Sequence, residues 1–174
     1  MYRTNTSPIF VFVEAIPVAD TPTSHAFDGC AVCRYERNLG VPHAEALAMA
    51  EAEAQVLLEK YGWIVHITTQ TPYAHTRGVF QQWGHCEFEL RLAVADEHRV
   101  RFLNTLVFAV RDGRTFRADT TVTDLFTVPV RLVARTAAGQ PVLRVVFPDP
   151  AGRFPDDPAC APGYADQLLE DEPF

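Results

Sequence analysis

The chain has 174 residues and a formal net charge of −7, with 48% hydrophobic and 21% charged residues. A chain of this length can fold around its own core without a disulfide or a metal, and this composition is too hydrophobic for intrinsic disorder. Its only lysine is Lys60. Nucleic acid is therefore excluded as an expected partner, because phosphate contacts need clustered lysine and arginine. A basic protein partner would suit the acidic charge.

The sequence also argues against contact with a membrane. It has no run approaching the roughly 20 apolar residues that a spanning helix needs. The first residues, Met1 to Pro8, lack the basic start and the apolar run of a signal peptide. We therefore expect a soluble, cytoplasmic protein.

The first half of the chain predicts a strand, a long connection, a helix and a second strand. Ile9 to Val18 is a continuous apolar run, which is typical of a strand buried centrally in a sheet. Asp20 to Gly40 is rich in turn residues and predicts an irregular connection. A helix should run from Pro42 to Tyr61, because proline suits the first turn and Gly62 suits the position after the end. Trp63 to Thr69 has the composition of a strand.

This helix has an apolar stripe and, on its far side, two further apolar residues. Met49 and Val56 lie one heptad apart among glutamates, where a solvent-facing surface needs no apolar side chains. They are either scattered surface residues or the contact face of a homodimer or a covering loop. The stripe expected to face the core consists of Leu47, Ala50, Ala54, Leu57, Leu58 and Tyr61.

The middle of the chain predicts a loop and two strands. Gln70 to Trp83 is polar and aromatic, with proline and glycine as breakers, and indicates a loop. Residues 87–94 alternate between apolar and charged, as in a half-buried strand. Arg99 to Arg111 fits both a helix and a strand, and the following Asp112-Gly113 favours a strand in a hairpin. The alternative is a helix with Asp96 as its N-cap.

The remaining sequence predicts three more strands and a tail. Residues 114–122 should be the partner strand of this hairpin, and Thr127 to Arg135 and Pro141 to Phe147 should form another pair around a glycine-containing turn. From residue 148 to 174 the chain is rich in proline and acidic residues, and we expect a tail packed on, or extending from, a single domain over residues 1–147.

The expected fold class is α+β, with one long helix packed on a mostly antiparallel, curled sheet. The element order is strand, helix, strand and then a meander, which suits grip or hot-dog arrangements by analogy of fold alone. If residues 96–111 form a helix, the order becomes a ferredoxin-like βαββαβ unit with an added hairpin.

Cys30 and Cys33 form a Cys-x-x-Cys motif, the spacing of half of a tetrahedral zinc site. Cys86 and His25 are the candidates for the other half. His85 and Cys86 should not both be ligands, because neighbouring strand residues point to opposite faces. The alternative is that these cysteines are ordinary thiols and that the protein has no cofactor.

The predicted loop and the residues just after it carry side chains able to bind anions, stack on rings or move protons: Tyr73, His75, Arg77, Gln81, Gln82, Trp83 and His85. Tyr73, His75, Arg77 and Trp83 are the candidate binding residues. Two strand residues, Glu14 and His66, join His75 and Arg77 as weak candidates for catalysis, because a buried carboxylate or imidazole has a perturbed pKa. No nucleophile, base and orienting group can be assembled from the spacing, and the common nucleotide and hydrolase motifs are absent.

The leading functional hypothesis is therefore a non-catalytic, soluble protein-binding module: an accessory, inhibitory or immunity-type protein. One alternative is a small grip-fold enzyme or small-molecule-binding protein with its site between helix and sheet. Another is a protein with a structural zinc at the Cys-x-x-Cys motif.

Overall fold

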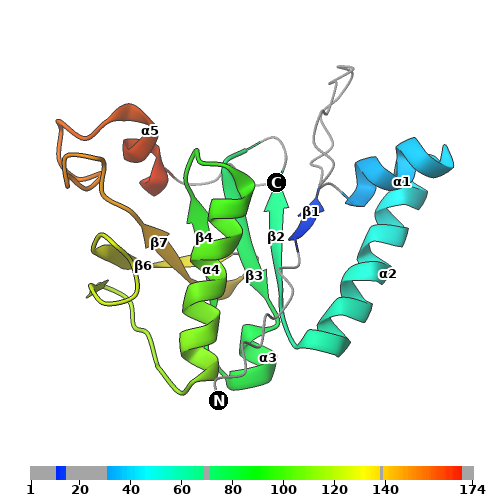
Figure 1. The fold of residues 1–174 in the computed structure, drawn as a ribbon, viewed down its shortest axis with the longest axis horizontal. Helices are drawn as coiled ribbons and strands as arrows, with labels where there is room; N and C mark the ends of the chain where they lie inside the picture. Colours follow the sequence, from blue (N-terminus) through cyan, green and yellow to red (C-terminus); the bar gives the residue numbers. More distant parts are fainter. Residues whose placement is uncertain (1–10, 15–30, 69–70, 138, 170–174) are drawn as a thin grey trace, which may run out of the picture.

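The computed structural model describes residues 11–14, 31–68, 71–137 and 139–169 (Figure 1). They form an α+β fold built on one mixed sheet of seven strands, in the order β1-β2-β3-β4-β7-β6-β5. The strands are β1 (Val11–Glu14), β2 (Ile64–Thr68), β3 (Tyr73–Arg77), β4 (Glu87–Arg91), β5 (Thr120–Val122), β6 (Val130–Ala137) and β7 (Gln140–Val146). The helices are α1 (Ala31–Leu39), α2 (His43–Tyr61), α3 (Val79–Trp83), α4 (Asp96–Arg111), α5 (Pro162–Ala165) and the 3₁₀ helix η1 (Asp166–Leu168).

The sheet consists of two antiparallel meanders and one added strand. The strands β2, β3 and β4 form the first meander, and β5, β6 and β7 form the second. The two meanders join where β4 runs parallel to β7, and β1 adds to the free side of β2, also in parallel. Among the strands that the structure describes, β1 thus lies at one end of the sheet, so its predicted central position is wrong. Hydrophobicity shows that a strand is buried but not which strand it pairs with.

The predicted helix over residues 42–61 is confirmed. It begins after Pro42, which has an extended backbone, and it ends at Gly62, which has φ 86° and donates its N–H to the carbonyl of Leu58. Its fully buried residues are small: Ala46, Ala50 and Ala54. Because these alanines form the contact face, the helix packs closely, and Leu47 lies 38% exposed instead of in the core.

The prediction of a strand over Arg99 to Arg111 is wrong, and the helical alternative is correct. The segment is α4, in which Asp96 lies in the first turn and Ala95 is the N-cap. Gly113, with φ 94°, donates its N–H to Val110, so Asp112-Gly113 ends a helix instead of turning a hairpin. The helix buries a single stripe of side chains, namely Arg99, Val100, Leu103, Asn104, Leu106, Val107 and Val110.

One face of the sheet is apolar and packs against α4, which crosses it in Figure 1. Cross-strand pairing defines this face, because residues directly opposite one another point the same way. One row of buried side chains runs across five strands of it: Ile67, Ala74, Leu90, Val145 and Leu132.

The opposite face carries α2 and the C-terminal segment. Arg77 lies on this face, opposite Ile64, and its Nη1 donates to Glu51 of α2 at 2.6 Å. At the other end, η1 packs on β4, and the buried side chain of Gln167 pairs with both the N–H and the C=O of Phe147. The described part of the expected tail, residues 148–169, therefore includes a segment held against the sheet.

The other predicted elements agree with the structure in part. The strand pair over residues 127–135 and 141–147 is confirmed as β6 and β7, whereas residues 114–122 contribute only the short β5. The predicted loop over residues 70–83 contains β3 and α3, and the predicted connection over residues 20–40 contains α1. The grip-like order is not confirmed, because two long helices, α2 and α4, cover opposite faces of the sheet.

Candidate functional site

A row of ionisable side chains crosses the face of the sheet opposite α4. His66, His75, Glu89 and Arg144 lie directly opposite one another on β2, β3, β4 and β7. Only 4% of His66 and 2% each of Glu89 and Arg144 is exposed. Tyr73 is on the same face as His75, two residues earlier on β3. Such a row is costly to bury, so each member needs a partner or has to be neutral.

The two charges in the row neutralise each other. The Nε of Arg144 donates to Oε1 of Glu89 at 2.6 Å, and the Tyr73 hydroxyl donates to Oε2 at 3.0 Å. The Nη1 of Arg144 donates to the backbone carbonyls of Gln167 at 3.2 Å and Leu169 at 2.7 Å. The ion pair is thus completed by a hydroxyl and by the C-terminal segment, as a buried pair requires.

The two histidines remain neutral at pH 7. Burial, with smaller contributions in the same direction from His75 and Arg77, lowers the pKa of His66 to about 3. Burial and the Arg77 charge likewise lower the pKa of His75 to about 4. The rings stack with centroids 4.9 Å apart and 21° between their planes. The Nδ1 atom of His75 is buried and has no hydrogen-bond partner among the described residues.

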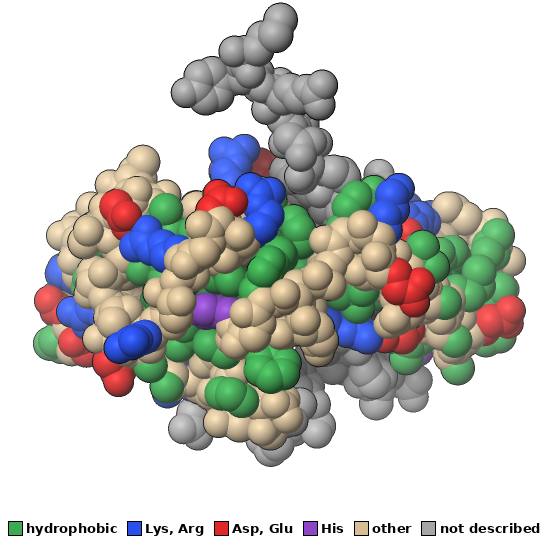
Figure 2. All heavy atoms as spheres, turned by 90° about the horizontal axis from the view of Figure 1, so that it is seen from below, with side chains coloured by type: hydrophobic (Ala, Val, Ile, Leu, Met, Phe, Trp, Pro, Cys, Tyr) green, Lys and Arg blue, Asp and Glu red, His purple; other side chains and the backbone are tan. Residues whose placement is uncertain are grey.

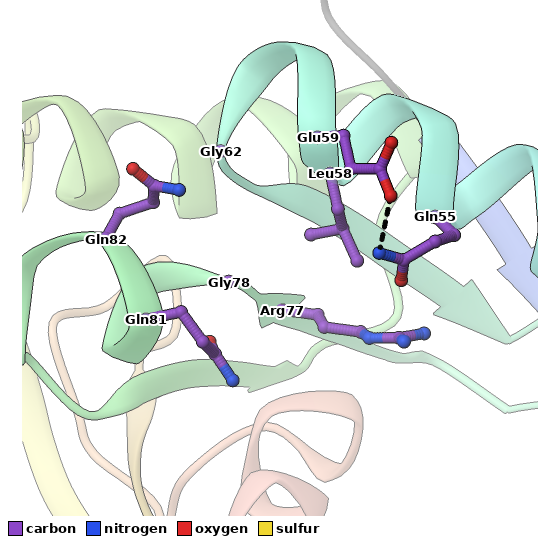
Figure 3. Close-up of a pocket in the computed structure, with 8 residues that line it drawn as sticks. All are labelled: Gln55, Leu58, Glu59, Gly62, Arg77, Gly78, Gln81 and Gln82. Atoms are coloured by element: carbon purple, nitrogen blue, oxygen red, sulfur yellow. Dashed lines mark hydrogen bonds between the residues drawn. The ribbon is translucent and has the colours of Figure 1, made fainter.

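Arg77 lies at the end of β3 and lines a cleft of about 300 Å³ (Figure 3). The cleft lies between α2 on one side and α3 on the other, and five of the eight residues that line it have polar side chains. It consists of Gln55, Leu58, Glu59, Gly62, Arg77, Gly78, Gln81 and Gln82. In Figure 3 the side chains of Gln81 and Gln82 extend from α3, and the amide of Gln55 bonds Glu59 at 3.1 Å.

The start of the short helix α3 is held by hydrogen bonds from its backbone to the carboxylate of Glu87. Glu87 accepts hydrogen bonds from the N–H groups of Gly78 and Phe80, each at 3.0 Å. Phe80, on the same helix, is 61% exposed. Figure 2 views the molecule from the end where α3 lies, and apolar side chains reach the surface there.

The structure brings several of the predicted site residues together. Tyr73, His75 and Arg77 share one face of β3, and His66 stacks on His75. Glu14 pairs with Thr68 in the register of β1 and β2, two residues from the position of His66. Trp83 is separate from this group, because its ring packs against Trp63 with centroids 5.8 Å apart and helps to anchor α3.

The zinc hypothesis stays a prediction. Cys30 and His25 lie outside the described residues. Cys33 is buried in the first turn of α1, and Cys86 is half-buried just before β4, where burial raises the pKa of its thiol. Within the described ranges, no three side chains of His, Cys, Asp or Glu are grouped so that they could hold a metal ion.

The predicted interface on α2 also stays a prediction. Val56 is 61% exposed and Met49 is half-buried. Helix α1 packs along α2, where Arg34 forms an ion pair with Glu53 and the Tyr35 hydroxyl donates to the same carboxylate at 2.9 Å.

Sequence reasoning missed Glu89, Arg144 and Gln55 of the cleft. A signal for Arg144 exists, because it is a single charge within an otherwise apolar stretch, PVLRVVF. A charge in a buried strand requires a counter-charge. Glu89 carries no such signal, because charged and apolar residues alternate around it, and neither does Gln55, because polar residues on a helix are ordinary at a surface.

Comparison with protein-family models, with curated proteins and with solved structures gives no match to this chain. Among the helices in the described ranges, none is long and apolar enough to cross a bilayer. What the cleft and the polar row do therefore has to be inferred from their own side chains.

Proposed function

We propose that the protein is a non-catalytic protein-binding module whose binding surface is the cleft between α2 and α3. The observation that carries this proposal is the lining of the cleft, which includes the three amide side chains Gln55, Gln81 and Gln82. Each amide can donate and accept hydrogen bonds, as a peptide backbone does. A segment of a partner protein can therefore satisfy its backbone groups there, while Arg77 and Glu59 supply one charge of each sign.

An exposed aromatic side chain on α3, the helix that lines one side of the cleft, supports a protein as the ligand. Phe80 is 61% exposed on α3. Exposed aromatic side chains beside a polar surface are typical anchors of protein interfaces, where few residues provide most of the affinity. The net charge of −7 favours a basic partner, because opposite charges speed the encounter. Accessory, inhibitory and immunity-type proteins all act through surfaces of this kind.

The chemistry beside the cleft supports a role without catalysis. Glu89 is paired with Arg144 and with Tyr73, so its carboxylate is already engaged. A histidine whose pKa is about 4, as that of His75 is, is a weak base at pH 7. General bases work best when their pKa lies near the working pH.

Site-specific photo-crosslinking tests this proposal. A benzophenone amino acid is placed at Gln81, which is exposed in the cleft, and at Arg101, which is exposed on α4, as the control. We expect one protein in an extract of the source organism to crosslink through Gln81 and not through Arg101. The purified partner should then bind the Phe80→Asp variant at least tenfold more weakly. Equal crosslinking at both positions, or unchanged affinity of the variant, would refute the proposal.

A small polar molecule is the second candidate ligand, because a volume of about 300 Å³ is at the lower end of the sizes typical of small-molecule sites. A thermal-shift screen with polar metabolites tests it, with Arg77→Ala as the binding-deficient variant. Stabilisation of the wild type but not of the variant would favour this alternative, as would turnover of a substrate that is lost in His75→Gln.

A further inference from the structure

The second meander has an edge that is only partly paired. Strand β6 is eight residues long, and β7 pairs with it from Arg131 to Ala137. On its other side, β5 pairs only with Val130, Arg131 and Leu132. In the part of the chain that the structure describes, residues 133–137 therefore have no strand on their outer side. Backbone N–H and C=O groups at such an edge are a template for another strand.

This half-edge has only one of the features that usually prevent strand addition. Residues 133–137 contain no proline and no lysine, and their pairing with β7 continues without a bulge. Its side chains are mostly small, and Ala134 and Thr136 are exposed. Proteins normally protect edges with charges, prolines or bulges. Arg135 is the only charge within residues 133–137, so the edge stays open to a segment that carries the opposite charge.

Arg135 indicates the chemistry of the added segment. It lies at the centre of the half-edge, and its Nη2 donates to the carbonyl of Leu168 at 3.3 Å. Its Nε is buried and has no hydrogen-bond partner among the described residues. A buried donor without a partner is destabilising and requires an explanation. A carboxylate on a neighbouring strand would supply the opposite charge.

A second copy of this chain does not fit the pairing that is centred on this half-edge. Antiparallel pairing of two β6 strands about a two-fold axis through the middle of residues 133–137 would place Arg135 opposite Arg135. Like charges directly opposite across two strands are destabilising. An unrelated chain has no such restriction.

We propose that β6 is a docking edge, at which an extended acidic segment of another protein pairs with residues 133–137 and places a carboxylate beside Arg135. This interface is independent of the cleft between α2 and α3, because the two surfaces share no residue.

Residue-resolved hydrogen exchange on the whole chain tests the proposal with two capped peptides. One alternates Glu and Val, and the other alternates Lys and Val. At millimolar concentration the acidic peptide should slow exchange of amides within residues 133–137 at least tenfold, and the basic peptide should have a much smaller effect. Protection by neither peptide, or equal protection by both, would overturn the proposal.

Two variants then test the role of the charge. In Arg135→Leu, both peptides should slow amide exchange within residues 133–137 equally. The matched control is Arg131→Leu, in the part of β6 that β5 covers, and it should keep the preference for the acidic peptide. A preference that persists in Arg135→Leu would also overturn the assignment. If this variant fails to fold, the wild-type comparison decides. A doubled mass in light scattering without peptide, together with protection of residues 133–137 that rises with protein concentration, would instead identify a second copy as the occupant.

Discussion

Glu89 and Arg144 form an ion pair across β4 and β7, with 2.6 Å between Oε1 and Nε and with 2% of each side chain exposed. They lie directly opposite each other in the register of the two strands. The attraction between them offsets the cost of removing two charges from water only while both are present.

Removing one member of this pair should destabilise the protein severely. Glu89→Leu leaves a buried guanidinium without its counter-ion, at a cost of about 3–5 kcal/mol. The double variant with Arg144→Leu should recover most of that loss. Urea unfolding measures both. The control is Asp124→Ala, which breaks the exposed pair with Arg114 and should unfold close to the wild-type midpoint. Equal midpoints for Glu89→Leu and the control would contradict the prediction.

Stability should fall as the pH decreases below about 6.5, the pKa of histidine in an unfolded chain. The folded-state pKa values of His66 and His75 are lowered to about 3 and about 4. Between these values and about pH 6.5, the unfolded state therefore binds more protons than the folded state. The stabilisation is fully present above pH 6.5, and each histidine removes about 1.4 kcal/mol per pH unit on the way down.

Ring titration by NMR and urea midpoints between pH 7 and 5 check this dependence. His75→Phe retains an aromatic ring beside His66 but cannot take up a proton, so its midpoint should depend less on pH than that of the wild type. A His66 or His75 ring that titrates near pH 6.5 would show that burial does not hold the imidazole neutral.

Gly78→Ala should be among the most destabilising changes near the cleft. An added Cβ would lie 2.3 Å from the carbonyl oxygen of Gly62, and the residue has φ 107°. Gly113→Ala is the matched control, because Gly113 has φ 94° but no heavy atom within 4 Å of the added Cβ. The control should lose only the roughly 1–2 kcal/mol of a left-handed backbone. Thermal unfolding should therefore give a clearly lower midpoint for Gly78→Ala, and similar midpoints would count against the close approach.

Gln167→Leu should loosen the C-terminal segment. The amide of Gln167 donates to the carbonyl of Phe147 at 2.8 Å and accepts from its N–H at 2.9 Å. Leucine leaves both backbone groups buried without these bonds, at about 1–3 kcal/mol for each. The exposed Gln140→Leu should have little effect. Faster proteolysis of the segment in Gln167→Leu than in the wild type is the expected result, and equal rates would speak against this anchoring role.

The elements that sequence predicts well are those whose ends carry local signals. The second helix has Pro42 before its first turn and Gly62 at its end, and both act within a few residues of the chain. For residues 99–111 the apolar positions match two periods, and Asp112-Gly113 suits either a hairpin or the end of a helix. The helix is favoured because it buries the apolar face of the sheet. This contact depends on long-range packing, which local sequence signals do not show.

The candidate site could be predicted only in part. Tyr73, His75 and Arg77 stand out by residue type, but their strand was missed because its outward positions are polar and its inward ones, Ala74 and Thr76, are small. This alternation has little contrast in hydrophobicity. The partner of Glu89 lies 55 residues away along the chain. Nothing local in the sequence identifies which arginine it is.

The parallel pairing of β4 with β7 has a consequence for how the chain folds. A slip of two residues along it would keep every side chain on its own face, so the burial of apolar groups would not oppose the error. Glu89 would then face Val142 or Val146 instead of Arg144, leaving two interior charges apart. The ion pair thus selects one register between the two meanders. The strands of each meander are close together in sequence, so each meander can form before the two pair.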